Sequence, residues 1–342
     1  MFSEKFHEKL LKEEDPFPDI LGLEETKKQL KSALLADRHV IIVGPPGIGK
    51  TTLAKNVAKL LPEIDVVQGC PYHCNPKNPI CPQCRDGKNK KVAKVKGDNR
   101  FIRIQGSPDL AAEDLLGDID PIKALQFGPA SLEAFSPGKI FKANNGILFF
   151  DELNRCPEKL QNSLLQVLEE GKATLGAYDL DIPADFLFIG TMNPEDISTE
   201  PMSDVLLDRF DLIFMPYPDT KNHEIEIVNI KGKTFPVTFP EPLVDAMVEF
   251  VRLLRESDQL EKKPSVRASL GLYERAQTNA LLRKGSEVSL ADLSDAVVSV
   301  LSHRIRLKPS VKYLQSPKVY VKEQFQKFIE QIEDKLQHGD LR

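Results

Sequence analysis

The chain lacks the features of a membrane or secreted protein. No stretch of its 342 residues approaches the ~18 uninterrupted apolar residues that a membrane-spanning helix requires. The segment from Met1 to Asp19 mixes lysine, glutamate and aspartate where a signal peptide would be apolar. These absences predict a cytoplasmic protein without a membrane partner.

The chain also lacks an excess of basic residues. Its 46 lysines and arginines are outnumbered by 51 aspartates and glutamates, which gives a formal net charge of −5 at pH 7. A protein that coats nucleic acid needs the opposite balance, so we do not expect nucleic acid as the main partner. Basic residues do predominate between Arg85 and Arg100, but such a run is usually a solvated face.

Cysteine is scarce, and four of the five cysteines lie close together, at Cys70, Cys74, Cys81 and Cys84. In a reducing compartment such a cluster suggests a metal before a disulfide. Four thiolates at this spacing can close a tetrahedral zinc site. An iron–sulfur cluster would also accept them, with His73 able to replace one ligand, and a cluster without metal is the third alternative. We expect the fifth, Cys156, to be a packed small residue.

The most informative stretch reads G-P-P-G-I-G-K-T, from Gly44 to Thr51. It follows the apolar run His39 to Val43 and precedes an amphipathic helix, so the pattern has the strand, loop and helix context of a phosphate-binding loop. Lys50 would reach the β- and γ-phosphates and Thr51 a magnesium ion. The nucleotide-binding residues predicted here are Gly44, Pro45, Pro46, Gly47, Ile48, Gly49, Lys50, Thr51 and Thr52.

Two later apolar runs end in polar side chains. Gly146 to Glu152 reads as a strand buried on both faces and closed by Asp151 and Glu152. Open α/β sheets bind ligands at the carboxyl ends of their strands, where one carboxylate can hold magnesium and the other can orient an attacking water. Phe186 to Thr191 is a second such strand, and Asn193 follows it at a position close to that water.

Strands alternate with helices as far as Pro216, which predicts a three-layer α/β domain with a parallel sheet over residues 1–218. Within it we expect a Cys-rich insertion at about 70–86 and hairpin insertions at about 118–138 and 172–182. Helical spacing dominates afterwards, so residues 219–342 are predicted to form a smaller all-helical domain. The other predicted elements are helices at Phe6 to Leu11, Glu24 to Leu35, Asp109 to Leu116 and Pro157 to Glu169, and a strand at Phe101 to Ile104.

Taken in order, these motifs resemble those of the AAA+ ATPases, and within them the ATPase subunit of magnesium chelatase and the related MoxR group. The resemblance runs from about Asp19 to Leu307. Three features make the resemblance specific to the chelatase and MoxR branch. They are Glu113 to Gly117 with the insertion that follows, Lys142 to Gly146, and the predicted hairpin at 172–182. The motifs that carry it are Gly44 to Thr51, Phe149 to Glu152, Gly190 to Pro194, Leu207 to Phe210 and Ser265 to Arg267.

The resemblance implies a role for individual residues. Lys50 and Thr51 would belong to Walker A, Asp151 and Glu152 to Walker B, and Asn193 would be sensor 1. Arg209 would be the arginine finger offered to the neighbouring subunit's nucleotide, and Arg267 would be sensor 2 in the lid domain. The sequence D-E-L-N-R, which starts at Asp151, is closer to the MoxR version than to the chelatase version.

The implied function is an ATP-driven homo-oligomeric ring, a hexamer by resemblance, that remodels a partner protein so that a metal or cofactor is inserted. That partner would carry a von Willebrand A domain. ATP and magnesium are the implied cofactors. A nucleic-acid motor or loader that uses the hairpin insertions is the second hypothesis. A nucleotide-gated scaffold is the third, and the intact Asp151, Glu152 and Arg209 argue against it.

Overall fold

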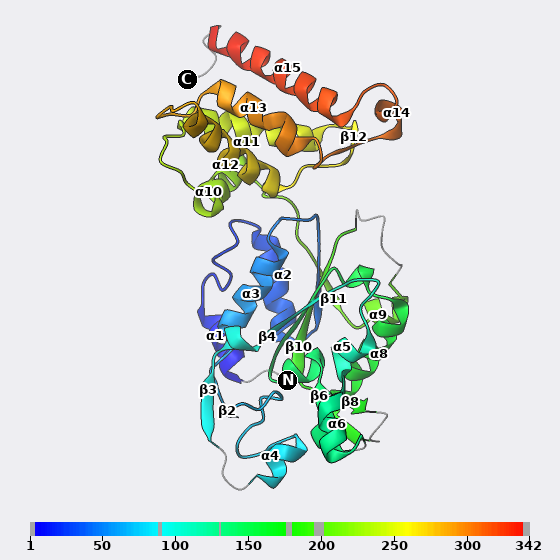
Figure 1. Ribbon diagram of the computed structural model, residues 1–342. Helices are drawn as coiled ribbons and strands as arrows, with labels where there is room; N and C mark the ends of the chain where they lie inside the picture. The colour runs from blue at the N-terminus through cyan, green and yellow to red at the C-terminus, as the bar shows by residue number, and fades with distance from the viewer. Residues whose placement is uncertain (1–3, 88–90, 130, 176–179, 195–201, 338–342) are drawn as a thin grey trace. The chain divides into compact units, whose positions relative to one another are not determined.

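The computed structural model describes residues 4–87, 91–129, 131–175, 180–194 and 202–337 (Figure 1). Contacts divide the chain into two units. The first comprises Met1–Gly44 and Gly49–Met215, and the second comprises Pro45–Ile48 and Pro216–Arg342. None of the helices in the described part of the chain combines the length and the apolar character that crossing a bilayer requires.

A five-stranded parallel sheet forms the centre of the first unit. Its order is β11-β1-β10-β7-β4, and each neighbouring pair runs parallel. The three inner strands, Val40–Val43, Gly146–Asp151 and Phe186–Met192, are almost wholly apolar, as expected where helices cover both faces of a sheet. The predicted parallel sheet is confirmed. The strands are β1 (Val40–Val43), β4 (Phe101–Gln105), β7 (Gly146–Asp151), β10 (Phe186–Met192) and β11 (Asp211–Phe214).

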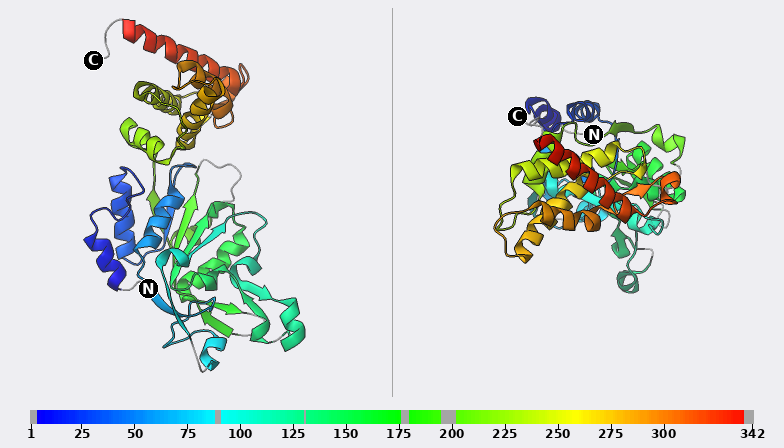
Figure 2. Two further views of the ribbon diagram at one scale, coloured as in Figure 1. Left: turned by 60° about the vertical axis from the view of Figure 1, so that its left-hand side comes forward. Right: turned by 90° about the horizontal axis from the view of Figure 1, so that it is seen from above.

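Helices lie on both sides of this sheet. Figures 1 and 2 show α1, α2 and α3 on one side and α8 and α9 on the other. The helix α8 packs through Leu160, Leu164 and Val167, which recur at helical spacing along one face. The helices of this unit are α1 (Glu4–Lys12), α2 (Glu24–Leu35), α3 (Lys50–Leu60), α4 (Pro82–Asp86), α5 (Ala112–Leu116), α6 (Pro121–Phe127), α7 (Lys139–Lys142), α8 (Glu158–Glu170) and α9 (Asp204–Leu207), with 3-10 turns at Gly97–Arg100, Leu132–Ala134 and Leu153–Arg155.

Within the described residues, three antiparallel strand pairs extend the first unit. The sequence did not predict the first of these pairs, in which β2 (Ile64–Val67) pairs with β3 (Val92–Val95) and the cysteine segment lies between them. The predicted insertion at 118–138 has its own structure, in which β5 (Gly117–Ile119) pairs with β6 (Phe135–Pro137) around α6. The predicted hairpin at 172–182 pairs β8 (Lys172–Leu175) with β9 (Leu180–Pro183), and its residues 176–179 lie outside the described residues.

The second unit is a helical bundle (Figure 2). It has its own apolar core. Phe250 is buried in this core, and its ring centroid lies 4.9 Å from that of Phe325 and 5.3 Å from that of Phe328. One short antiparallel ladder, β12 with β13, joins the helices and was not predicted. The elements are α10 (Lys221–Lys231), α11 (Glu241–Glu256), β12 (Leu260–Lys262), α12 (Val266–Leu282), α13 (Leu290–Leu301), β13 (Arg306–Leu307), α14 (Pro309–Lys312) and α15 (Pro317–Gln337).

Candidate active site

The loop from Gly44 to Gly49 joins β1 to α3. Gly47 and Gly49 have φ values of +76° and +106°, which L side chains rarely adopt, so the loop geometry requires glycine at both positions. Because α3 begins at Lys50, the first-turn N–H groups of this helix stand at the end of the loop, where they can bind an anion. The ammonium of Lys50 donates to the carbonyl oxygen of Gly44 at 2.6 Å.

Asp151 is the last residue of β7, and its carboxylate has a partner on each oxygen. Thr191 of β10 donates its hydroxyl to Oδ1 at 2.7 Å, and Arg103 of β4 donates from Nη2 to Oδ2 at 2.5 Å. Both partners come from strands that flank β7 in the sheet. The strand register therefore sets the orientation of this carboxylate.

Glu152 follows directly and has a left-handed backbone, with φ of 56°. Its N–H donates to the Thr191 hydroxyl at 2.9 Å, which fixes the backbone. Oε2 accepts from the Gln105 amide at 2.9 Å and lies 3.0 Å from Nη1 of Arg155. About a third of the side chain, 35%, stays exposed, so water can reach a carboxylate whose direction is fixed.

Asn193 follows β10, which lies between β1 and β7 in the sheet. Its backbone carbonyl accepts from the Asn154 side chain at 3.2 Å. The carboxyl ends of three adjacent strands thus bring Gly44, Asn193 and Asp151 to one edge of the sheet. This is the edge at which open α/β sheets bind ligands.

The two arginines from the resemblance make other contacts. Arg209 donates from Nη1 to the carbonyl of Val205 at 2.6 Å and forms an ion pair with Glu169 of α8. Arg267 is the second residue of α12 in the second unit. Within that unit, a Cβ built on Gly47 would lie 3.0 Å from Cγ and Cδ of Arg267.

Four residues that contact the carboxylates of Asp151 and Glu152 were not predicted from the sequence: Arg103, Gln105, Arg155 and Thr191. A signal was present for two of them. In the strand at Phe101 to Gln105, polar residues alternate with apolar ones, so Arg103 and Gln105 share a face. The parallel register pairs Gln105 with Asp151 and carries that face to the end of β7.

The four clustered cysteines meet as a group. Their sulfur atoms all lie within 4.8 Å of one another, and Sγ of Cys70 and Cys81 are 3.8 Å apart. In a tetrahedron with Zn–S bonds of about 2.3 Å, the sulfur atoms are about 3.8 Å apart. Backbone N–H groups of Ile80 and Cys81 point at Sγ of Cys74, at 3.3 and 3.4 Å.

Residues between the first two cysteines bind the turn that precedes β7. Asn144 donates its side-chain amide to the carbonyl of Tyr72 at 2.8 Å, and Asn145 donates to the carbonyl of His73 at 3.4 Å. The His73 ring places Nδ1 3.3 Å from the carbonyl of Asn144, so His73 faces this turn and the ligand group is formed by cysteines. Cys156 is buried in the core, as predicted.

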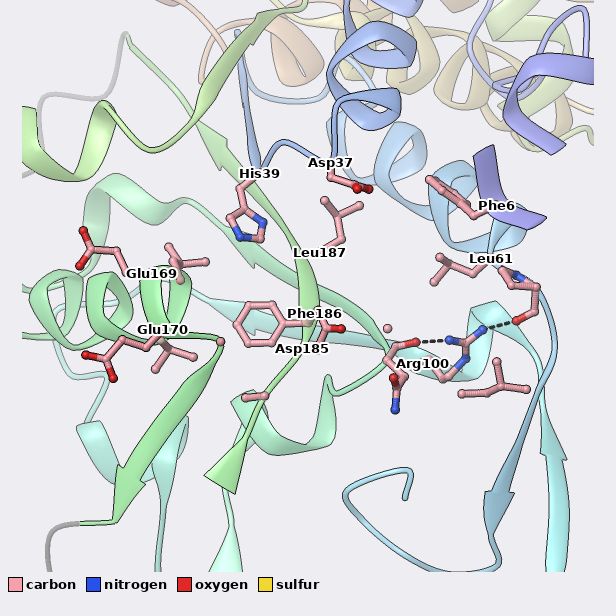
Figure 3. A pocket seen from close by; sticks show the side chains of 18 residues that line it. Phe6, Asp37, His39, Leu61, Arg100, Glu169, Glu170, Asp185, Phe186 and Leu187 are labelled. Carbon is pink, nitrogen blue, oxygen red and sulfur yellow. Dashed lines mark hydrogen bonds between the residues drawn. The ribbon is translucent and has the colours of Figure 1, made fainter. Parts of the chain in front are cut away.

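A cavity of about 430 Å³ opens at the opposite edge of the sheet (Figure 3). It is lined at the amino ends of the strands by His39, Phe186 and Arg100, whose guanidinium donates to the carbonyls of Asn145 and Pro62. Burial lowers the pKa of His39 to about 4, and Nδ1 accepts from the Phe188 N–H at 3.1 Å. The cavity is therefore separate from the edge that carries Asp151 and Glu152.

Comparison with known proteins decides the family. The chain is 30% identical over 322 residues to a magnesium-chelatase subunit ChlI homolog of Methanocaldococcus jannaschii, with 86% of each chain covered. The chain belongs to the magnesium-chelatase ChlI family of AAA ATPases. A second ChlI relative, from Chlorella vulgaris, is 31% identical over 323 residues, covering 86% of this chain and 90% of the relative.

Family profiles agree with this membership. Residues 16–70 match the profile described as magnesium chelatase, subunit ChlI, and residues 85–212 match the ATPase family associated with various cellular activities. Residues 253–320 match the AAA lid domain. A solved structure described as the complex between subunits BchI and BchD of magnesium chelatase shares the fold, with a TM-score of 0.50 and 23% identity over 87% of this chain and 98% of that one. The predicted AAA+ fold class is confirmed.

Proposed function

We propose that this ChlI-family chain hydrolyses ATP to ADP and phosphate as one subunit of a homo-oligomeric ring, a hexamer by resemblance. The observation that carries the proposal is the fixed, partly exposed carboxylate of Glu152 at the carboxyl edge of the sheet. A scaffold that only binds nucleotide has no need of a carboxylate whose backbone and side chain are both held in place.

The residues present fit Mg·ATP. Glycines with positive φ let a loop turn its N–H groups toward phosphates, and a hydroxyl with a carboxylate is the oxygen donor set that magnesium prefers. Lys50 would bind the β- and γ-phosphates, and Thr51 with Asp151 would hold the metal ion, which neutralises phosphate charge when bound. Glu152 would accept the proton of the attacking water, and Asn193 would orient that water.

Arg209 is proposed to act in the neighbouring subunit, and Arg267 to act as sensor 2. In its own chain Arg209 is held by Glu169 and Val205, away from the contacts that surround Asp151 and Glu152. A guanidinium supplied by a neighbour is typically worth ~10³–10⁵ in rate. Hydrolysis would then depend on assembly.

The work done by the ring is proposed to be remodelling of a partner protein so that a metal or cofactor is inserted. The family name and the BchI–BchD complex support a protein partner, and a von Willebrand A domain in that partner is part of the proposal. A cytoplasmic location is proposed with it.

We also propose that the four clustered cysteines hold one structural zinc ion. Support comes from the Cys70 to Cys81 sulfur separation of 3.8 Å, which matches the edge of a zinc–thiolate tetrahedron. The backbone N–H groups directed at Sγ of Cys74 are hydrogen bonds of the kind that orient metal-binding side chains.

Mixing two inactive variants tests the ring mechanism. Arg209→Ala chains keep their own Glu152, and Glu152→Gln chains keep Arg209, so mixed rings contain interfaces with both groups intact and should recover ATPase activity. Lys50→Ala mixed with Glu152→Gln is the matched control. Each of these variants is defective in its own nucleotide site, so no site in a mixed ring has all of its groups intact. Equal activity in both mixtures, with normal assembly, would contradict the proposed role of Arg209.

A further inference from the structure

The second unit contains a buried ion pair between two of its helices. Glu224 of α10 is fully buried, and Arg255 of α11 is 7% exposed. Arg255 donates from Nη1 and Nη2 to the two carboxylate oxygens at 2.5 and 2.6 Å. Taking two charges out of water is costly unless their remaining donors and acceptors are also paired. The other groups that contact Glu224 and Arg255 therefore show which segments the ion pair connects.

One set of additional partners lies at the start of α12. Nε of Arg255 donates to the carbonyl of Pro264 at 2.7 Å, and Ser269 donates its hydroxyl to Oε1 of Glu224 at 2.6 Å. Pro264 precedes the N-cap of α12, whereas Ser269 lies in its first turns and is fully buried. The ion pair thus binds α12 on both sides of Arg267.

The other set lies in the segment that begins the second unit. The Arg255 guanidinium carbon stands 4.7 Å from the ring centroid of Tyr217. Arg252 donates to the carbonyls of Pro218 and Asp219 at 3.0 and 3.3 Å, and its Nη1 is 3.6 Å from Glu224. Glu224 is consequently linked to residues 217–219 through Arg252 and Arg255, and it also binds the start of α12 through Ser269.

The same turn of α12 also lies beside Gly47, which belongs to the second unit. A Cβ on Gly47 would lie 3.0 Å from Oγ of Ser265 and 3.0 Å from Cδ of Arg267, all within the second unit. A movement of the first turn of α12 would therefore displace the Arg267 side chain from Gly47.

We propose that the Glu224 network, formed by Glu224, Arg252, Arg255 and Ser269, is a positioning device for ATP hydrolysis. It holds residues 217–219 and the first turn of α12 as one rigid piece, so that Arg267 keeps its place beside Gly47. The inference rests on the proposed role of Arg267 as sensor 2. The inference goes beyond that role because it names the residues that hold Arg267 in position.

A double-mutant cycle tests this inference. Ser269→Ala removes one hydrogen bond to a charged group and should lower kcat by about three- to tenfold. In an Arg267→Ala background the same change should cost less than about twofold, because coupled residues are not additive. Arg252→Gln, at a less buried position, should behave in the same way. Arg283→Gln, which breaks the Arg283–Asp292 ion pair elsewhere in this unit, is the control and should leave kcat unchanged in both backgrounds.

Nucleotide affinity and melting temperature are measured for each variant. Equal losses of kcat in both backgrounds would overturn the inference, since they indicate general damage to the lid. If Arg267→Ala itself leaves kcat unchanged, the proposed role of Arg267 fails, and amide hydrogen exchange then tests the network alone. In Ser269→Ala, protection should fall together at Tyr217, at Asp219 and at the start of α12. A loss of protection confined to one of these segments would contradict the proposal that they form one rigid piece.

Discussion

Arg103 and Asp151 form an ion pair of 2.5 Å across neighbouring strands, although more than half of the arginine side chain, 53%, is exposed. The guanidinium neutralises the carboxylate proposed to hold magnesium. Because both cations are attracted to the same oxygens, we predict that Arg103→Gln lowers the half-saturating magnesium concentration by about two- to fivefold, the range expected for an exposed pair.

A magnesium titration of fluorescent-nucleotide binding measures this effect. Arg38→Gln is the matched control, because it breaks an exposed Arg38–Asp211 pair of 3.2 Å before the amino end of β1. An unchanged or higher magnesium requirement in Arg103→Gln would show that Arg103 orients Asp151 without competing with the metal.

Lys50→Ala should weaken ATP binding by about 10- to 100-fold, since it removes a charge-assisted hydrogen-bond donor from the phosphates. Lys55→Ala, at an exposed position on the same helix, should bind ATP normally. Equilibrium titration with a fluorescent nucleotide compares the two variants. Equal affinities would rule out the phosphate-loop assignment.

The cysteine cluster should carry about one zinc per chain in protein purified without added metal, and Cys74→Ser should lose it. Cys156→Ser replaces a buried cysteine outside the cluster and should retain the full zinc content. Elemental analysis gives the answer, and an absorption spectrum detects an iron–sulfur cluster. Protein with neither zinc nor iron would leave the four thiols without a metal role.

Acid should destabilise the first unit through His39. Burial lowers its pKa from 6.5 to about 4, so the unfolded chain takes up a proton at a higher pH than the folded chain. The free energy of unfolding therefore decreases by about 3 kcal/mol in total as pH falls from about 6.5 to about 4.

His39→Gln should remove this part of the pH dependence, whereas His303→Gln, at an exposed position, should keep it. The sequence contains no tryptophan, so scanning calorimetry is the suitable measurement. An identical pH profile in His39→Gln and the unaltered protein would contradict the assignment.

The central sheet could be predicted because its strands are continuous apolar runs, such as Val40–Val43 and Gly146–Asp151. The β2–β3 hairpin could not, because Ile64–Val67 and Val92–Val95 are short, partly polar and separated by the proline-rich cysteine segment. A pairing over that distance leaves no local pattern in the sequence.

For the candidate site, Lys50, Asp151 and Glu152 could be identified from the sequence because each stands in a motif with a fixed spacing. Their partners could not. Arg103 meets Asp151 only through the register of β4 on β7. The Arg255–Glu224 pair of the second unit likewise joins two separate helices. Such contacts depend on tertiary packing, which neither periodicity nor spacing encodes.

The cysteine segment shares the core of the first unit. Cys74, Cys81 and Cys84 belong to the same apolar cluster as Leu148 and Phe150 of β7. Excising the segment to obtain a shorter ATPase would open a hole in the core that includes Leu148 and Phe150, instead of trimming a surface loop. A relative without these cysteines would have to fill the same space with other apolar side chains, so the gain or loss of the metal centre should be accompanied by changes in the surrounding core.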